Sequence, residues 1–478
     1  MNPRLDARIL GMLAAVLAAF LLVPLAVAAG LGEPLRPWLI AIAATLAVAA
    51  AGWLAGIGAP TLLRPRDGFL VVGAGWFLAG ALCAAPYVLA GALGPVDAWF
   101  EAVSGITTTG STVMVDIEGQ TASLLLWRSL TQWIGGMGII LFTIAILPLL
   151  GVGGMQLFKA EVPGPVADKI APRLAVTARY LWGIYVGLTA LEALLLRAGG
   201  MPWLEAVDHA FTTLATGGFS PRNASIEAYP SLYLRGVIIV FMFAAGMNFV
   251  LHFRLLTGRV REVFRDEEFR WYVALIVLFT VPAAANLVEH GHAPGEAIED
   301  ALFTVVSLMT TTGYATADYE AWPLHMAGPV ILLLILGGMA GSTGGGLKTL
   351  RTLLAFRSLR ASFRRMLHPH AVYPVRYRGR PVPGDVLEAI WGFFAAYLLL
   401  AALGALVVNY SGADLVTSWS ASLTAIGNVG PGLGGVGPTD NFAWLPGYVK
   451  LTLSFLMLAG RLELYTILLL LLPGFWRR

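Results

Sequence analysis

The sequence predicts an all-α integral membrane protein with ten transmembrane helices: four pseudo-symmetric helix–pore loop–helix repeats around a central pore, plus an N-terminal helix pair. Three observations lead to this prediction: an apolar composition, many apolar runs of membrane-spanning length, and a short sequence that recurs four times. Of the 478 residues, 58% are hydrophobic and 12% are charged, whereas soluble proteins carry about 25% charged residues. This composition argues against a soluble protein.

Ten apolar runs reach or approach the roughly 20 residues that cross a bilayer as an α-helix. They lie near residues 9–31, 37–59, 69–93, 124–150, 175–198, 232–256, 271–290, 327–356, 386–410 and 445–473. The first run lacks an A-x-A cleavage site and is longer than the apolar core of a signal peptide, so we expect it to remain as a helix. The single cysteine, Cys83, excludes an intrachain disulfide and a Cys-cluster metal site.

The positions of Lys and Arg predict the orientation of these helices, because cytoplasmic loops carry an excess of both residues. With the N-terminus in the cytoplasm, all but seven of the 31 Lys and Arg residues fall in cytoplasmic segments. The exceptions are Arg36, Arg128, Arg197, Arg222, Arg235, Lys450 and Arg461. We therefore expect a multi-pass protein of the cytoplasmic (inner) membrane, surrounded by lipid, with both termini in the cytoplasm.

Four segments align without gaps. They read SGITTTGS at 104–111, FTTLATGG at 211–218, SLMTTTGY at 307–314 and TAIGNVGP at 424–431, so that Gly110, Gly217, Gly313 and Gly430 share one position. Before each glycine lie about 12 residues with helical character, near 96–106, 203–214, 296–309 and 413–425. A helix this short cannot span the bilayer, so we expect each one to re-enter the membrane and to leave its following loop at membrane depth.

Irregular backbone at that depth is tolerated only where it is buried in protein or lines a water-filled cavity. Four such loops can converge on one axis, where their carbonyl oxygens would replace the hydration shell of K⁺ as in potassium-channel filters. Glycine permits the unusual φ and the close backbone approach that this requires. The expected K⁺ ligands are Thr108, Thr109, Gly110, Ala215, Thr216, Gly217, Thr311, Thr312, Gly313, Asn428, Val429 and Gly430. K⁺ is the transported ion, and we expect no covalently bound cofactor.

On these motifs the chain resembles the pore-forming subunits of the Trk/Ktr/HKT potassium-uptake superfamily, and its extra first pair of spans is similar to the Trk branch. The resemblance covers about residues 65–475. It implies an N-terminal extension at 1–62 and pore repeats at 63–160, 161–262, 263–366 and 367–478. In that family, glycine at all four filter positions goes with potassium selectivity, whereas serine at the first goes with sodium permeation. The fourth segment departs from the Thr-Gly pattern, but its Asn-Val-Gly-Pro-Gly is similar to the family's fourth filter.

A glycine-rich stretch interrupts the eighth span. It contains Gly337, Gly338, Gly341, Gly344, Gly345 and Gly346 and ends at Lys348. So many glycines will not hold a straight helix. A phosphate-binding P-loop is excluded, since Leu347 precedes Lys348 where that motif has glycine. A tightly packed flexible stretch remains possible, while the resemblance implies a gating loop at 337–348 that blocks the pore below the filter.

Arg461 lies within the tenth span, where an arginine by default faces a cavity or a partner. An arginine that snorkels to the interface is the alternative, and the resemblance implies a positive barrier in the pore. Glu101 and Asp208 each lie nine residues before an aligned glycine. Their carboxylates could raise the cation concentration at the pore entrance, or they could pair within the short helices.

These observations predict potassium-selective uptake without covalent chemistry, so we do not expect an enzyme. Two alternatives are a secondary transporter coupling Na⁺ or H⁺ to K⁺ or another solute, which would bind its solute at broken helices near the midplane, and a membrane-embedded enzyme. The resemblance further implies a homodimer and a TrkA-like cytosolic regulatory subunit that binds nucleotides, with no nucleic acid as partner. The basic loop at 357–380 could dock that subunit, or could reflect membrane topology alone.

Overall fold

The computed structural model describes residues 2–59, 65–141 and 174–477. Long helices are α1 (Pro3–Leu31), α2 (Arg36–Ala55), α3 (Pro65–Leu89), α5 (Ala122–Leu141), α7 (Leu174–Ala198), α12 (Glu267–Glu289), α15 (Thr349–Leu367) and α16 (Gly384–Tyr410). Shorter ones are α4 (Pro95–Ile106), α8 (Trp203–Leu214), α9 (Leu232–Ala245), α10 (Phe249–Leu256), α11 (Val260–Arg265), α13 (Pro294–Met309), α14 (Ala327–Ile335), α17 (Leu415–Gly427), α18 (Gly447–Arg461), α19 (Tyr465–Leu471) and α20 (Pro473–Trp476). Strands β1 (Arg376–Tyr377) and β2 (Arg380–Pro381) form an antiparallel hairpin.

The described helices fit a membrane protein. Six are long and apolar enough to cross a bilayer, or eight if each of two bent helix pairs counts as one span. The fourth predicted span corresponds to α5, and its last residues, 142–150, lie outside the described residues, as do the predicted boundaries at 62 and 160. The eighth corresponds to α14 and α15, which a non-helical segment separates. The mostly helical membrane class is therefore confirmed, and the count of ten stays a prediction.

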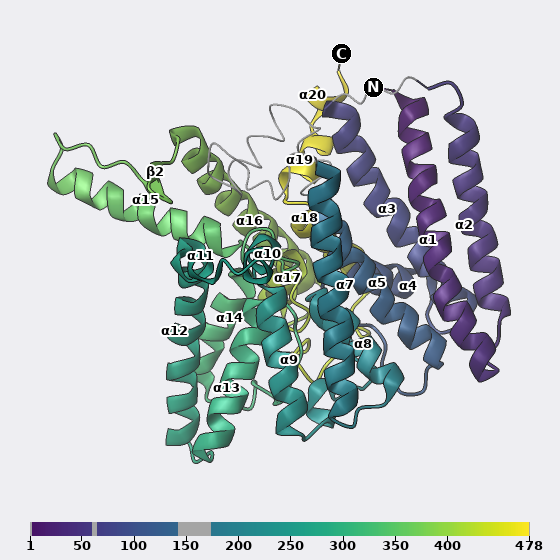
Figure 1. Cartoon of the computed structure of the whole chain (residues 1–478), viewed down its shortest axis with the longest axis horizontal. Helices are drawn as coiled ribbons and strands as arrows, with labels where there is room; N and C mark the ends of the chain where they lie inside the picture. Colours follow the sequence, from purple (N-terminus) through teal and green to yellow (C-terminus); the bar gives the residue numbers. More distant parts are fainter. Residues whose placement is uncertain (1, 60–64, 142–173, 478) are drawn as a thin grey trace.

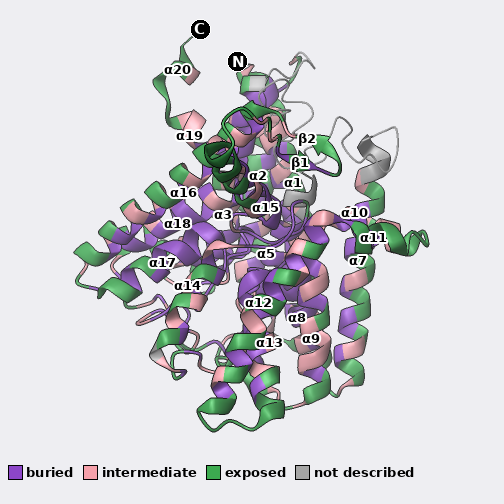
Figure 2. Cartoon of the chain, turned by 90° about the vertical axis from the view of Figure 1, so that its left-hand side faces the viewer, coloured by how far each residue is buried: buried purple, intermediate pink, exposed green. Residues whose placement is uncertain are grey.

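Apolar side chains cover much of the outer surface. Leu232, Val240, Leu278 and Leu406 are each more than 60% exposed. Figure 2 shows the pattern: buried residues fill the middle of the molecule and exposed ones lie on the outward faces of helices such as α7 and α16. Large exposed apolar surfaces are unusual on soluble proteins and mark contact with a membrane or a partner, so these helix faces suit contact with lipid.

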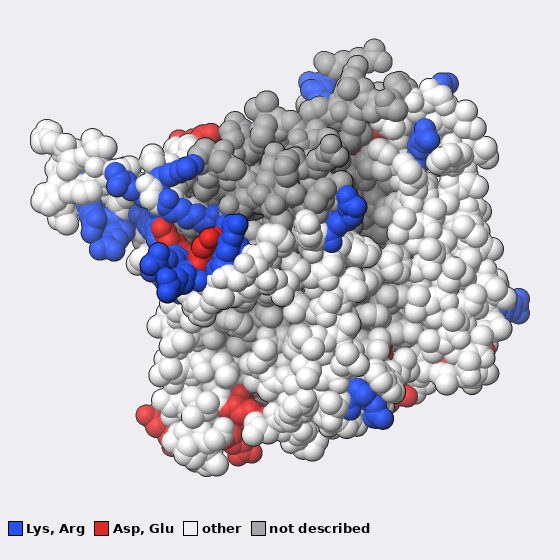
Figure 3. Space-filling model, viewed as in Figure 1, with Lys and Arg blue, Asp and Glu red and all other residues white. Residues whose placement is uncertain are grey.

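The two chain termini lie at the same end of the molecule, and α1 and α2 form a peripheral pair along one side of it (Figure 1). Helix α15 projects sideways and carries the β-hairpin. Lys and Arg gather around α11 and the start of α15, whereas acidic residues gather at the far end near α12 and α13 (Figure 3). Exposed members of the two groups are Arg259, Arg261, Arg265, Glu289 and Glu296. By the positive-inside rule, a basic end of this kind is expected to face the cytoplasm.

Two predicted spans, 232–256 and 445–473, are not continuous helices. Helices α9 and α10 meet at 106°, and α18 and α19 meet at 119°. At the first bend Asn248 starts a new helix, because its side chain accepts a hydrogen bond from Val250 N at 2.8 Å. At the second bend Glu463 and Leu464 have φ of +58° and +47°, which an α-helix cannot contain. Hydropathy predicted each of these runs as one span and did not indicate the bend within it.

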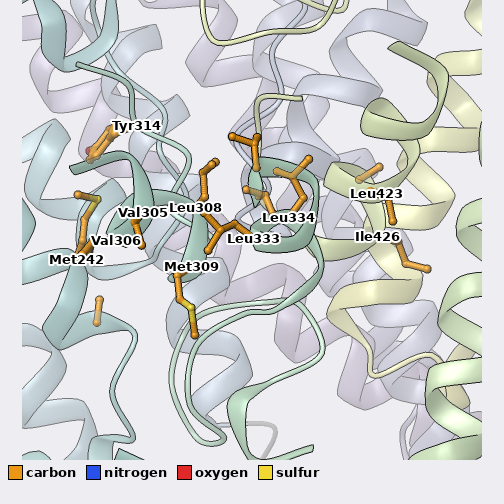
Figure 4. Packing of buried hydrophobic residues seen from close by; sticks show 14 of the residues in the cluster. Met242, Val305, Val306, Leu308, Met309, Tyr314, Leu333, Leu334, Leu423 and Ile426 are labelled. Atoms are coloured by element: carbon orange, nitrogen blue, oxygen red, sulfur yellow. The ribbon is translucent and has the colours of Figure 1, made fainter. Parts of the chain in front are cut away.

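The short helices α13 and α17 both pack against α14. Val305 and Leu308 of α13, Leu333 and Leu334 of α14, and Ile426 of α17 are all buried in one apolar cluster. Figure 4 shows these side chains directed into the space between the three helices. This packing holds the C-terminal ends of the short helices at the centre, where the candidate site lies.

Candidate ion pathway

Four short helices, α4, α8, α13 and α17, end with the same backbone path. After each last turn comes a residue with left-handed φ: Thr108 (+54°), Thr216 (+54°), Thr311 (+62°) and Asn428 (+54°). The N–H of the next residue bonds to the carbonyl five positions earlier, in the pairs Thr109–Ser104, Gly217–Thr212, Thr312–Ser307 and Val429–Thr424, at 2.8–3.0 Å. A glycine with positive φ follows: Gly110 (+88°), Gly218 (+72°), Gly313 (+79°) and Gly430 (+110°).

This shared path corrects the sequence alignment in the second segment. Gly218, not Gly217, has the conformation of Gly110, and Gly217 corresponds to Thr109. The gapless alignment is one residue out because the segment has two consecutive glycines and the first was matched. Matching Thr216 to Thr108 instead would have given the correct register.

The four segments form a closed ring. A Cβ added at each glycine would meet the carbonyl oxygen that precedes the glycine of a neighbouring segment. The four pairs are Gly110 with Gly217 O, Gly218 with Thr312 O, Gly313 with Val429 O, and Gly430 with Thr109 O. The last pair, at 2.9 Å, returns from the fourth segment to the first. Glycine is therefore required at these positions for two reasons: the backbone has a positive φ, and the neighbouring carbonyl leaves no space for a Cβ.

A cavity of about 80 Å³ opens on one side of this ring. Gly110, Gly218, Gly313 and Gly430 all line it, together with polar groups such as Ser111. The C-termini of the four short helices meet at the ring, and a helix C-terminus carries a partial negative charge that favours cations. The available donors there are carbonyl and hydroxyl oxygens, which suit a hard cation. Among the described residues, no group of three or more His, Cys, Asp or Glu could hold a metal ion.

A buried ion pair supports the first segment. Glu101 on α4 pairs with Arg128 on α5 at 2.6 Å, and both side chains are at most 3% exposed. The Glu101 carboxylate also accepts a hydrogen bond from Val113 N at 2.9 Å, just beyond the ring. Arg128 in turn donates to Ser220 O at 2.8 Å and lies over the Phe219 ring, 3.6 Å from its centroid. Glu101 therefore pairs within the protein instead of standing free at an entrance.

Asp208, the other acid singled out from the sequence, is also buried on its short helix, α8. Its carboxylate accepts a hydrogen bond from Ser129 Oγ at 2.5 Å. Of the two interpretations left open by the sequence, the structure favours pairing inside the protein over an entrance role for both acids.

Further hydrogen bonds join neighbouring segments. Ser111 Oγ donates to Gly430 O at 2.8 Å, and Asn428 Nδ2 donates to Thr109 Oγ1 at 2.9 Å, which together tie the first segment to the fourth. The hydroxyl groups of Tyr314 and Thr212 lie 2.5 Å apart and tie the third to the second. Sequence reasoning missed these roles, although Ser111 and Tyr314 directly follow ring glycines.

The glycine-rich segment 336–348 lies against the helix ends that form the ring. It is non-helical, with positive φ at Gly337, Gly341, Gly346 and Lys348. Its hydrogen bonds reach three short helices: Gly345 N to Thr311 Oγ1 (2.7 Å), Gly346 N to Gly427 O (2.9 Å) and Thr343 Oγ1 to Leu214 O (3.0 Å). Two further glycines of the segment pack on backbone too, since a Cβ on Gly344 would lie 2.8 Å from Thr310 O and one on Gly338 3.0 Å from Gly246 O.

Arg461, the last residue of α18, contacts the same segment. Its Nη1 donates to Thr343 O at 2.7 Å and its Nη2 to Gly135 O at 3.2 Å. The residue is 3% exposed, so it does not snorkel to the surface. Glu463 pairs with Arg351 at 2.7 Å instead of with Arg461. Lys348 Nζ donates to Gly344 O within the segment. A buried positive charge therefore holds the glycine-rich segment at Thr343.

A family model described as a cation transport protein, TrkH, matches residues 37–474. The chain belongs to the TrkH family of cation transport proteins. It is 43% identical over 423 residues to the Trk system potassium uptake protein TrkH of Salmonella typhimurium, covering 87% of each chain. It is 36% identical over 484 residues to TrkH of Halomonas elongata, covering 100% of both. The crystal structure of the potassium transporter TrkH from Vibrio parahaemolyticus matches with a TM-score of 0.91 at 35% identity, covering 100% of each chain.

Proposed function

We propose that this chain takes up K⁺ across the cytoplasmic membrane, through a selectivity filter made by the four segments at 108–110, 215–218, 311–313 and 428–430. The closed ring carries this proposal: each glycine lies against the carbonyl of a neighbouring segment. Potassium uptake proteins among its relatives support the choice of ion. Carbonyl and Thr hydroxyl oxygens would replace the hydration shell of the ion. Gly218 is added to the predicted ligands, because it occupies the ring position that the sequence alignment assigned to Gly217.

The gate of this pathway is the segment 337–348 together with Arg461. Backbone bonded to the ends of three short helices stands in the way of an ion leaving the ring. An arginine stays protonated in proteins, so its charge against Thr343 O opposes a cation at the same place. Conduction then requires the segment to move away from the ring.

The remaining features of the proposal concern the whole assembly. They are ten spans in four repeats after an N-terminal pair, both termini in the cytoplasm, a homodimer, and a cytosolic nucleotide-binding regulatory subunit. The shared backbone path of the four short helices supports the repeats. The Arg-rich surface around α11 and α15 supports the orientation and offers a docking site for the regulatory subunit (Figure 3).

A secondary transporter is the second candidate, because the bends at α9–α10 and α18–α19 resemble the broken helices that bind solutes in such proteins. Both bends, however, lie beside the glycine-rich segment: Met339 N bonds to Gly246 O at 2.8 Å, and Arg461 bonds to Thr343 O. The two bends are therefore explained at least as well by a role in the gate as by a role in binding a solute.

Growth of a potassium-transport-deficient bacterium at low K⁺ tests the proposal. The chain should restore growth, and a Gly110→Asp variant present at equal amounts in the membrane should not, because a side chain there displaces Gly217 O. Rubidium uptake into the same cells should continue when the Na⁺ gradient is removed. Uptake that stops when the Na⁺ gradient is removed would favour the transporter, and failure to restore growth would contradict potassium uptake.

A further inference from the structure

Gln132 lies on α5, outside the four segments, yet it holds both sides of the second segment. Its side chain is fully buried. Nε2 donates to Gly217 O at 2.7 Å, and Oε1 accepts from Phe219 N at 3.1 Å. The partners determine which way the amide points, because a carbonyl can only accept and a backbone N–H can only donate. Gln132 therefore bridges across Gly218, the ring glycine of this segment.

The amide also explains the first glycine of the Gly217-Gly218 pair. Gly217 lacks the positive φ of Gly218, so its conformation does not call for glycine. A Cβ on Gly217 would instead overlap the amide carbon and oxygen of Gln132. Glycine at 217 thus provides the space that Gln132 needs, while glycine at 218 provides the turn.

The bond from Gln132 makes the ring unequal. Gly217 O is one of four corresponding carbonyls, the others being those of Thr109, Thr312 and Val429. Among the residues that the structure describes, Gly217 is the one member of this set whose carbonyl accepts a side-chain hydrogen bond. The same oxygen lies against Gly110 of the first segment. Its position therefore sets the spacing between two neighbouring members of the ring.

Helix α5 is itself held firmly, which lets Gln132 act as a fixed support. Arg128 lies one turn before Gln132, on the same helix face. It forms the buried pair with Glu101 and donates to Ser220 O. Gly135, three residues beyond Gln132, accepts from Arg461. One face of α5 thus contacts the first segment, the second segment and the arginine below the ring.

We propose that Gln132 is a positioning residue for ion discrimination: it fixes the Gly217 carbonyl so that the ring cannot contract around Na⁺. This inference rests on the proposed potassium function. A carbonyl with no such support can move toward a smaller ion, and the preference for K⁺ then falls. Gln132 itself touches no ion in this account, so its effect is on the ratio of the two affinities.

The test measures K⁺ and Na⁺ affinity by isothermal titration calorimetry on the purified full chain, which needs no open gate. Gln132→Met keeps the side-chain volume and removes both hydrogen bonds. Gly217→Ala disturbs the same contact from the other side, through the overlap of its Cβ with the amide. Thr131→Val is the matched control: a buried neighbour on α5 whose hydroxyl donates within the helix, to Arg128 O at 2.7 Å.

We expect the K⁺/Na⁺ affinity ratio to fall about tenfold or more in Gln132→Met and in Gly217→Ala, and to stay at the parent value in Thr131→Val. A folded Gln132→Met with the parent ratio would overturn the role of Gln132 and leave the potassium function standing. If Gln132→Met does not give monodisperse protein, a parent K⁺/Na⁺ affinity ratio in Gly217→Ala would also overturn the role of Gln132. A parent chain that does not prefer K⁺ would overturn both proposals.

Discussion

The ring of four segments and the glycine-rich segment below it are both irregular backbone inside a membrane protein, but they are built in different ways. The ring repeats one backbone path four times, and each repeat packs against a carbonyl of the neighbouring repeat. Among the residues that the structure describes, the segment at 336–348 has no counterpart with the same backbone path. It is attached to the ring mainly by hydrogen bonds from Thr343, Gly345 and Gly346.

The difference teaches how one chain can keep a fixed part next to a movable one. Close contacts that leave no room for a Cβ occur in both parts, but the ring is also supported by the buried ion pair between Glu101 and Arg128. Residues 341–346 carry no large apolar side chain, so moving them exposes little apolar surface. Each hydrogen bond that they release costs only about 0.5–1.5 kcal/mol. Changes near the ring should therefore alter stability or ion preference, and changes in the lower segment should alter rate.

The largest effect is expected from the ion pair that supports the ring. Glu101→Gln keeps the shape of the side chain but leaves Arg128 buried without its counter-charge. Removing one partner of a buried pair costs about 3–5 kcal/mol, which should be measured as a lower free energy of unfolding in denaturant. Asp97→Asn on the same helix is the control, because Asp97 is 37% exposed in its pair with Lys450 and should cost less. Equal losses in the two variants would contradict a special role for the Glu101 pair.

The next effect concerns ion preference. Gly110→Ser places a Cβ at φ +88° and onto Gly217 O, so the ring must widen or rotate. We expect the permeability ratio of K⁺ over Na⁺ in reconstituted vesicles to fall about tenfold or more, equivalent to about 1.4 kcal/mol. Gly91→Ser has a similar positive φ of +73° but open space around it, and it should keep the parent ratio. A parent-like ratio in Gly110→Ser would show that the ring does not select the ion.

The smallest effect is on rate, at the lower segment. Arg461→Ala removes the donors to Thr343 O and Gly135 O together with the positive charge. Deletion of residues 344–346 removes the bonds to Thr311 Oγ1 and Gly427 O. Both variants should raise potassium flux several-fold with little change in the K⁺/Na⁺ ratio, whereas Arg461→Lys, which keeps the charge, should stay closer to the parent. If both variants fold and conduct no faster than the parent, the segment is structural.

The helical membrane fold could be predicted from the sequence because an apolar run of about 20 residues is long enough to cross a bilayer. Within the bilayer, an α-helix satisfies all the backbone hydrogen bonds of such a run. The bends at Asn248 and after Arg461 could not, because they depend on tertiary contacts. Gly246 O accepts a bond from Met339 N, and a Cβ on Gly460 would overlap Ile426 O. Neither contact can be detected from the hydropathy of the sequence.

For the candidate site, the sequence indicated the four segments and the glycine-rich stretch, and the structure brings them together. To align the second segment correctly, one must know that α8 ends at Leu214. Helix boundaries predicted from a sequence are uncertain by a residue or more, which is enough to shift the alignment by one position. Arg128 carried a usable signal, since a charged residue inside an apolar span calls for a partner. Gln132 carried almost none, because a neutral polar residue on such a helix has many possible partners.

The central claim is that the four segments form a site for K⁺ at the centre of their ring. Crystals of the full chain grown with Rb⁺ or Tl⁺ in place of K⁺ would test it through anomalous scattering. The account predicts an ion peak on the ring axis, among the carbonyl oxygens of Thr109, Gly217, Thr312 and Val429, that remains when Na⁺ is added at the same concentration. A ring without a peak, or a peak that lies elsewhere in the protein, would contradict it.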